Sequence, residues 1–181
     1  MSKAFAELDE RELLALAISL EEEDSRIYRH FRERLKKDHP EVAATIQPIY
    51  EEEFSHQTRL IELYHQTFGD HILFIRTHDV KGLLKRRPFW LRPLLRPKKV
   101  LAEVMRMEAE GRRFYTEAVN QVISPAAKKL FRDLAEEEED HQDLLVKKWK
   151  ENKKPIVFSF DRIQSIVLFS QDRSIGIACL R

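Results

Sequence analysis

The sequence predicts an all-α fold: a bundle of four helices with a long crossover between the second and the third. Only 4 of its 181 residues are glycine, and few stretches alternate polar with apolar residues as half-buried strands do. Instead, four segments repeat apolar residues at steps of three and four, which is the spacing of one helix face. A chain of this length suits a single domain with a sizeable core.

Local signals place the ends of the four helices. Asp9 with Glu12 forms a capping box before the first helix, and Ser124 followed by proline is typical of the start of the fourth. Pro48 lies inside the second segment, where it is expected to kink the helix or to mark its effective start. The predicted helices run approximately from 10 to 37, 40 to 67, 98 to 122 and 125 to 150.

Residues 70–97 form the predicted crossover. This segment contains three prolines and is too long for a hairpin loop. It is expected to carry the chain from one end of the bundle to the other, which would make the second and third helices parallel. The bundle is assigned to residues 1–151, and residues 152–181 form an atypical tail. The tail is apolar and β-like, and is expected to be a strand, a hairpin, a docked arm or poorly ordered.

Charge and cysteine content limit the partners and the compartment. The net charge of +1 gives no global field that would indicate nucleic acid or a membrane surface. A basic run at residues 81–99 contains Phe89 and Trp90, a combination that can bind nucleic acid or anionic lipid, but such runs are usually solvated loops, so no nucleic-acid partner is expected. The single cysteine, Cys179, excludes a disulfide framework within the chain. No secretory signal or membrane-spanning run is found, which favours a cytoplasmic protein without a transmembrane segment.

Each apolar stripe is interrupted at its middle by an acidic residue. The first and third stripes carry a lone glutamate there, and the second and fourth carry a Glu-x-x-His motif. The two motifs are 85 residues apart in the sequence, and the two lone glutamates 87. The chain thus contains two similar helix pairs with one half of a site in each. The six residues are Glu21, Glu53, His56, Glu108, Glu138 and His141.

Four inward carboxylates at one level require compensation. Burying an isolated carboxylate costs several kcal/mol, and four together repel one another. Two divalent cations would balance the four negative charges, and residues at i and i+3 of a helix can reach the same ion. A lone Glu, a Glu-x-x-His, a second lone Glu and a second Glu-x-x-His form the ligand set of carboxylate-bridged two-metal bundles. The six residues are therefore predicted to be the metal ligands and the catalytic residues.

These motifs resemble the rubrerythrin branch of the ferritin-like superfamily, and most closely the erythrin-type domain of membrane-bound ferritins (erythrin–vacuolar iron transporter proteins). The resemblance covers about residues 5–150 and rests on LALAISLEEEDSRIYRHF, EEEFSHQTRLIELY, MRMEAEGRRFY, LAEEEEDHQDLL and the FGDHI and HDVKGLL segments of the connector. Full-length relatives of the erythrin type continue into a membrane domain, which is not found here. Classical rubrerythrins also carry a Cys₄ iron site, which one cysteine cannot form, so a separate redox partner is implied.

The resemblance implies a ferritin-like bundle that binds two iron ions and oxidises Fe(II) with O₂ or H₂O₂, in iron homeostasis or in defence against oxidative stress. Three alternatives stay open: a peroxidase with an external electron donor, a non-enzymatic iron-sensing or iron-delivery domain, and a purely structural helical protein. Manganese or zinc could replace iron at carboxylate and imidazole ligands. A homodimer is expected, with a second subunit covering some of Phe31, Leu35, Phe68, Phe114 and Phe131.

Further residues are candidates for supporting the ligands. Glu52 and Glu137 precede the two motifs and are placed to accept the second N–H of a ligand histidine. Tyr28 and Tyr115 lie seven residues after the lone glutamates, as core tyrosines or as hydrogen-bond partners of the site. Rubrerythrins have an additional glutamate where this chain has Gly111, and the resemblance suggests that Asp24 partly substitutes for it. A register error of two would exchange the lone glutamates for Glu23 and Glu110. Four neighbouring glutamates are expected to face solvent: Glu22, Glu51, Glu136 and Glu139.

Overall fold

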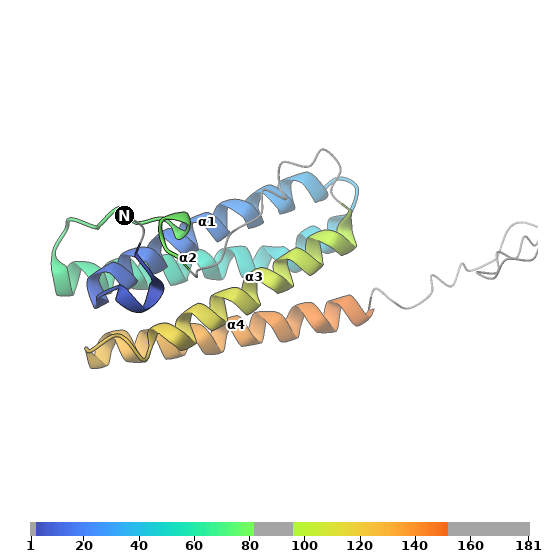
Figure 1. Ribbon diagram of the computed structural model, residues 1–181. Helices are drawn as coiled ribbons and strands as arrows, with labels where there is room; N and C mark the ends of the chain where they lie inside the picture. Colours follow the sequence, from blue (N-terminus) through green and yellow to red (C-terminus); the bar gives the residue numbers. More distant parts are fainter. Residues whose placement is uncertain (1–2, 82–95, 152–181) are drawn as a thin grey trace, which may run out of the picture.

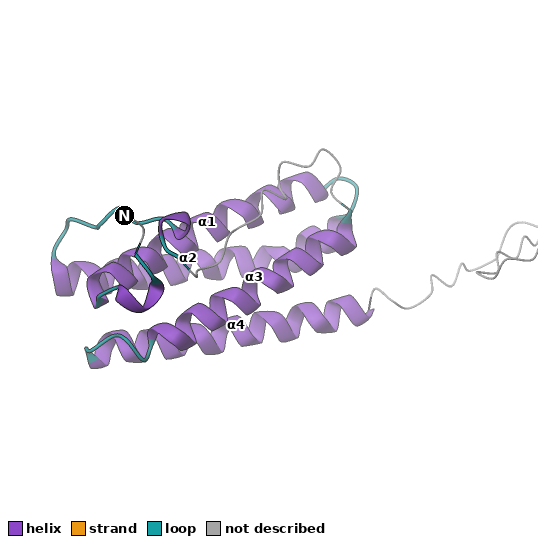
Figure 2. Cartoon of the chain, viewed as in Figure 1, coloured by secondary structure: helices purple, strands orange, loops and turns teal. Residues whose placement is uncertain are grey.

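Four long helices form the bundle, as predicted (Figure 1). The computed structural model describes residues 3–81 and 96–151. The helices are α1 (Glu10–Leu35), α2 (Pro40–Phe68), α3 (Pro97–Ala118) and α4 (Pro125–Glu151). Two short 3₁₀ helices, η1 (Phe5–Glu7) and η2 (Thr77–Asp79), flank them. The described ranges contain no strand (Figure 2). Ala4 and Lys81 form an isolated parallel bridge.

The helix starts follow the signals in the sequence. The Asp9 carboxylate accepts a hydrogen bond from the Glu12 backbone N–H at 2.8 Å, and Glu12 accepts one from the Asp9 N–H at 3.1 Å. This reciprocal pair is the predicted capping box. At α4, the Ser124 hydroxyl accepts a hydrogen bond from the Ala127 N–H at 3.2 Å. One of the free backbone donors in the first turn of each of these two helices is thus satisfied by a side chain of the chain itself.

Helix α2 is continuous from Pro40 to Phe68 and includes Pro48 in its interior. Two outcomes were expected for Pro48, a kink or the effective start of the helix. The second is wrong, because the helix begins at Pro40. The helix ends at Gly69, whose φ of 81° lies in the left-handed region that favours glycine.

Helices α2 and α3 run in the same direction along the bundle. Figure 1 shows that α2 ends at the end of the bundle where α1 begins, whereas α3 begins at the opposite end. Helices α2 and α3 are therefore parallel, as predicted. Helix α1 packs mainly along α2, and α3 along α4, while α2 with α4 and α1 with α3 close the bundle.

Two hydrophobic clusters fill the interior of the bundle. One includes Leu13, Tyr64 and Phe131, and the other includes Phe31 and Leu145. On each helix the acidic interruption of the apolar stripe lies between the two clusters. The polar residues are therefore enclosed by apolar layers above and below, at mid-height of the bundle.

Most of the residues expected to face a second subunit are already buried by this chain. Phe31, Leu35, Phe114 and Phe131 are at most 2% exposed, and Phe68 packs against the first cluster. For those four residues the assignment was wrong, because helical periodicity marks a buried face without showing which element covers it. Phe68 is half-buried, and the homodimer stays a prediction.

Two other expectations lie outside the described residues. The tail at 152–181 is one, and most of the basic run, including Phe89 and Trp90, is the other. Among the described helices, none has a stretch long and apolar enough to cross a membrane.

Candidate metal centre

The six predicted ligand side chains lie together at the centre of the bundle. Each helix contributes its own part: α1 and α3 one glutamate each, and α2 and α4 one Glu-x-x-His motif each. All of them are nearly inaccessible to solvent. The exposed fractions are 1% for Glu21, 2% for Glu53, 0% for His56, 0% for Glu108, 4% for Glu138 and 4% for His141.

The donor atoms form two overlapping groups. Glu21 and His56 form one group with Glu53 and Glu138, and Glu108 and His141 form the other with the same two glutamates. Within each group, one donor atom per residue lies within 4.8 Å of all the others. The two motif glutamates are thus shared between the groups, and each half-site has one histidine and one lone glutamate of its own.

Both histidines point the same ring nitrogen at the carboxylates. His56 Nδ1 lies 3.4 Å from Glu21 Oε2 and 3.7 Å from Glu138 Oε1, and His141 Nδ1 lies 2.9 Å from Glu108 Oε2. The two rings are nearly parallel, with centroids 5.8 Å apart. Nδ1 is therefore the nitrogen available to an ion at the centre, and Nε2 faces outward in each case.

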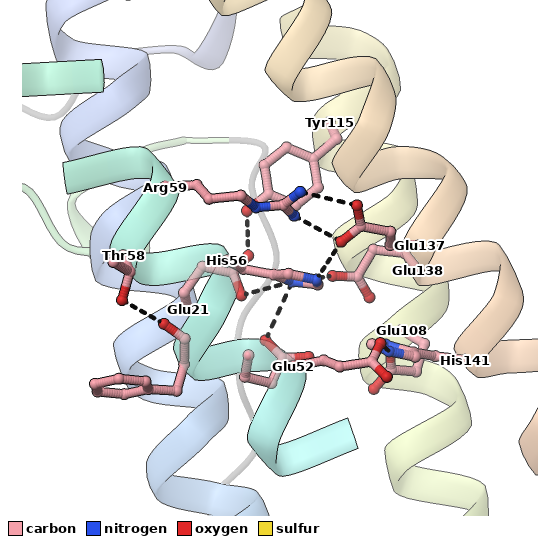
Figure 3. A network of polar contacts seen from close by, with 12 residues as sticks. Glu21, Glu52, His56, Thr58, Arg59, Glu108, Tyr115, Glu137, Glu138 and His141 are labelled. Atoms are coloured by element: carbon pink, nitrogen blue, oxygen red, sulfur yellow. Dashed lines mark hydrogen bonds and ion pairs between the residues drawn. The ribbon is translucent and has the colours of Figure 1, made fainter. Parts of the chain in front are cut away.

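The outward nitrogens meet glutamates of the opposite helix (Figure 3). His56 on α2 places Nε2 2.9 Å from Glu137 Oε2 on α4, and His141 on α4 places Nε2 2.7 Å from Glu52 Oε2 on α2. A carboxylate that accepts the outer N–H fixes the tautomer with a free Nδ1 and makes that nitrogen a better donor to a metal. Each outer glutamate thus contacts the histidine of the other motif, not that of its own.

The two tyrosines also cross between helices. The hydroxyl of Tyr28 on α1 donates to Glu108 on α3, and the hydroxyl of Tyr115 on α3 donates to Glu21 on α1. Both tyrosines are buried, and their hydroxyls hold the two lone carboxylates in place. Among the described residues, the pairs Tyr28–Glu108 and Tyr115–Glu21 are related by the same approximate two-fold symmetry as the motifs.

Gly111 gives one carboxylate the room it occupies. A Cβ at this position would lie 3.1 Å from Glu138 Cδ and 3.2 Å from Glu138 Oε2, closer than ordinary contacts. The symmetry-related place on α1 holds Asp24, which is buried at 6% exposure. A bulky group at residue 111 would therefore displace Glu138, whereas α1 accommodates a fifth carboxylate near the site.

The four carboxyl groups differ in their affinity for protons. Burial, together with the negative charge of Glu21, raises the pKa of Glu53 well above its usual value, and burial with Glu108 does the same for the pKa of Glu138. Burial alone would also raise the pKa of Glu21, but the Glu53 carboxyl and the His56 imidazole outweigh it and lower this pKa to about 2. The pKa of Glu108 is lowered in the same way against burial by His141 and Glu138.

The histidines favour the protonated form when no metal is present. Burial would lower the pKa of His56, but Glu137 and Glu21 raise it to about 9. Burial likewise opposes a rise in the pKa of His141, which Glu108 and Glu52 produce. These directions favour a metal-free cluster with two carboxylates, two carboxylic acids and two imidazolium rings. Cations that enter the site must displace those protons.

The site fits two divalent cations. Glu21 Oε2 and His56 Nδ1 are buried and face each other, and neither makes a hydrogen bond of good geometry within the described ranges. Buried polar atoms are nearly always satisfied, so this pair indicates a missing partner that accepts electron pairs. Carboxylate oxygens and imidazole nitrogens suit iron, manganese and zinc. Four carboxylates would neutralise two ions of charge +2.

Sequence patterns did not indicate the role of Arg59. Its guanidinium donates two hydrogen bonds to Glu137, at 2.9 and 2.6 Å, and so holds the partner of His56 (Figure 3). The contact with His56 and the pairing with Arg59 lower the pKa of Glu137 to about 2, although burial opposes this change. The spacing of Arg59, three residues after His56, is the only signal in the sequence. The four glutamates expected to face solvent are exposed: Glu22, Glu51, Glu136 and Glu139.

Comparisons with known proteins agree with this geometry. A model of the family described as Rubrerythrin matches residues 12–149, which include all four helices for most of their length. Among solved structures, a hypothetical protein from Pyrococcus furiosus is similar, with 26% identity and a TM-score of 0.65. The match covers 81% of this chain and 91% of that one. A comparison with curated proteins gives no match.

Proposed function

The chain belongs to the rubrerythrin family, and we propose that it binds two iron ions at the six-residue centre and oxidises Fe(II) with O₂ or H₂O₂. The observation that carries the proposal is the buried pair of half-sites that share Glu53 and Glu138. A mononuclear structural site would need only one of these groups. The duplication supports a reaction in which two metal ions act together.

Iron bound by these residues would supply the electrons that reduce the oxidant, one from each ferrous ion. The protein residues prepare that site. The hydroxyls of Tyr28 and Tyr115 hold the lone carboxylates, and Glu52 and Glu137 hold the imidazoles. The apolar clusters on both sides limit access of water. Glu53 and Glu138 favour the protonated form without metal, so they release protons when cations bind.

Stopped-flow oxidation of anaerobically loaded Fe(II) tests the proposal. Glu21→Ala and Glu108→Ala each remove one carboxylate and leave both Glu-x-x-His motifs intact. If the two ions act together, each variant should lose rapid oxidation rather than half of it. Glu22→Ala and Glu139→Ala are the matched controls because both side chains are exposed. Wild-type protein that binds iron but oxidises it no faster than free Fe(II) in the same buffer would overturn the enzymatic part.

The same experiment separates the alternatives. Faster oxidation with H₂O₂ than with O₂, sustained when an external electron donor is added, would favour a peroxidase. Iron that binds and exchanges without rapid oxidation would favour a sensing or delivery domain. The latter also suits the proposed likeness to erythrin-type domains, which rests on the motif sequences alone. Zinc or manganese in place of iron would show in metal analysis of the purified protein.

A further inference from the structure

The outer glutamates of the two half-sites are held differently, which is a second asymmetry of the centre besides that of Asp24 and Gly111. The offset of 85 residues that relates the Glu-x-x-His motifs also relates Glu52 to Glu137. It relates Arg59 on α2 to Leu144 on α4. One outer glutamate is therefore paired with a guanidinium, and its counterpart has an aliphatic side chain at the equivalent place.

This difference leaves one side of the α2–α4 seam closed. Arg59 binds Glu137 through two hydrogen bonds, and Glu137 contacts His56. The side chains of Arg59 and Glu137 are only 33% and 35% exposed. A cation approaching His56 from this side would have to break both bonds, and it would meet the positive charge of Arg59 first.

The other side is open to solvent and negative. The Glu52 side chain is 55% exposed while its Oε2 lies 2.7 Å from His141 Nε2, so one carboxylate touches both solvent and a ligand. Within the described ranges, no lysine or arginine is paired with Glu52. Exposed side chains change rotamer in picoseconds to nanoseconds. Glu52 can therefore swing away from His141 without breaking an ion pair with a lysine or an arginine.

We propose that metal ions enter and leave the centre on the Glu52 side of the α2–α4 seam, next to His141, and that the Arg59–Glu137 pair closes the other side. The proposal rests on the proposed function, since it concerns the same metal centre. Glu52 attracts the incoming cation and then returns to hold His141. The half-site of His141 exchanges its ion faster than the half-site of His56.

Binding kinetics of Co(II) to the metal-free protein, with no oxidant present, test this route. Absorbance of bound Co(II) in a stopped-flow instrument gives association and dissociation rates without any turnover. Glu52→Gln should slow association about thirtyfold at low salt, the effect of removing one unit charge at about 4 Å from a divalent cation in water, and should reduce its salt dependence. The matched control is Glu51→Gln, one residue earlier on the same helix and also exposed.

Leu144→Arg is the complementary variant. It copies the arrangement at Arg59, so the new guanidinium should hold Glu52 and slow both association and dissociation. Leu144 is only partly buried, so the longer side chain can reach solvent. Circular dichroism checks that both variants keep the helical fold.

The possible results separate the proposed entry route from the existence of the metal centre. If Glu52 only supported His141, Glu52→Gln would raise the dissociation rate and leave association unchanged, which overturns the proposed route. Wild-type association rates in both Glu52→Gln and Leu144→Arg would overturn it as well. If the wild-type protein takes up no Co(II), the metal centre itself is refuted together with the route. Slow association in both variants with an unaffected Glu51→Gln control is the expected result.

Discussion

Replacing Gly111 with alanine should stabilise the metal-free protein and weaken metal binding, two effects of opposite sign from one methyl group. The added Cβ would lie 3.1 Å from Glu138 Cδ and 3.3 Å from Glu138 Oε1. Real Cβ contacts below about 3.4 Å are uncommon, so the carboxylate must move by a few tenths of an ångström. A flexible side chain can do so cheaply when no ion holds it.

The two magnitudes follow from different properties. Alanine is favoured over glycine in a helix interior by about 1 kcal/mol, which corresponds to a rise in melting temperature of about 2–4 °C for a chain of this size. Metal bonds tolerate displacements of only about 0.2 Å. Because Glu138 is shared by both half-sites, its displacement should lower metal affinity about 10–100-fold, as disturbance of a supporting residue commonly does.

Thermal melting without metal and competitive Zn(II) titration measure the two effects. Thr116→Ala is the matched control, because Thr116 is an exposed residue of the same helix. It should gain a little helix stability and keep wild-type affinity. The close approach of Gly111 to Glu138 would have no functional meaning if Gly111→Ala bound zinc as tightly as wild type. A metal-free Gly111→Ala protein that melted well below wild type would contradict the assumption that the carboxylate moves cheaply.

Three further predictions concern stability, pH and assembly. Fe(II) or Zn(II) at a hundredfold excess over Kd should stabilise the fold by about 2.7 kcal/mol, and equal melting midpoints with and without metal would count against a buried site. The free energy of unfolding of the metal-free protein should fall as pH rises from about 6.5 to 9, because folded His56 keeps a proton up to a pKa of about 9 that the unfolded chain releases near 6.5. Urea denaturation at several pH values should show this fall, and saturating metal should reduce it; a rise with pH would refute the assignment. Light scattering at high protein concentration should show a dimer, and a monodisperse monomer would contradict it. In the described part of the chain, the exposed side chains of Phe54, Phe74 and Ile123 offer apolar surface for such a contact.

Local sequence patterns were sufficient to predict the four helices and the height in the bundle at which the acidic residues meet. The capping box at Asp9 and the proline after Ser124 are short-range signals, and the structure places α1 and α4 accordingly. The carboxylates meet because each helix carries its interruption at the same height between apolar stretches. The predicted positions of the helix ends were less accurate. Helix α3 ends at Ala118 and not at Val122, since the chain turns there with a hydrogen bond from the Gln121 N–H to the Ala118 carbonyl.

Contacts between helices could not be read from periodicity. Glu52 and Glu137 were recognised as partners for histidines, but the crossing of α2 and α4 decides which histidine each one meets. The same holds for the pairing of Tyr115 with Glu21. Arg59 has only its spacing of three residues from His56 as a signal, and its importance appears only when Glu137 lies opposite it. Tertiary packing sets these pairs, and a single sequence records only the faces that take part.

Anomalous diffraction from crystals soaked anaerobically in Fe(II) tests the central claim most directly. Two iron peaks should appear at the middle of the bundle, one bonded to Nδ1 of His56 and the other to Nδ1 of His141, at about 2.0–2.2 Å. Glu53 and Glu138 should contact both ions. A single peak, coordination through the outward Nε2 atoms, or peaks only on the surface would contradict the two-metal centre.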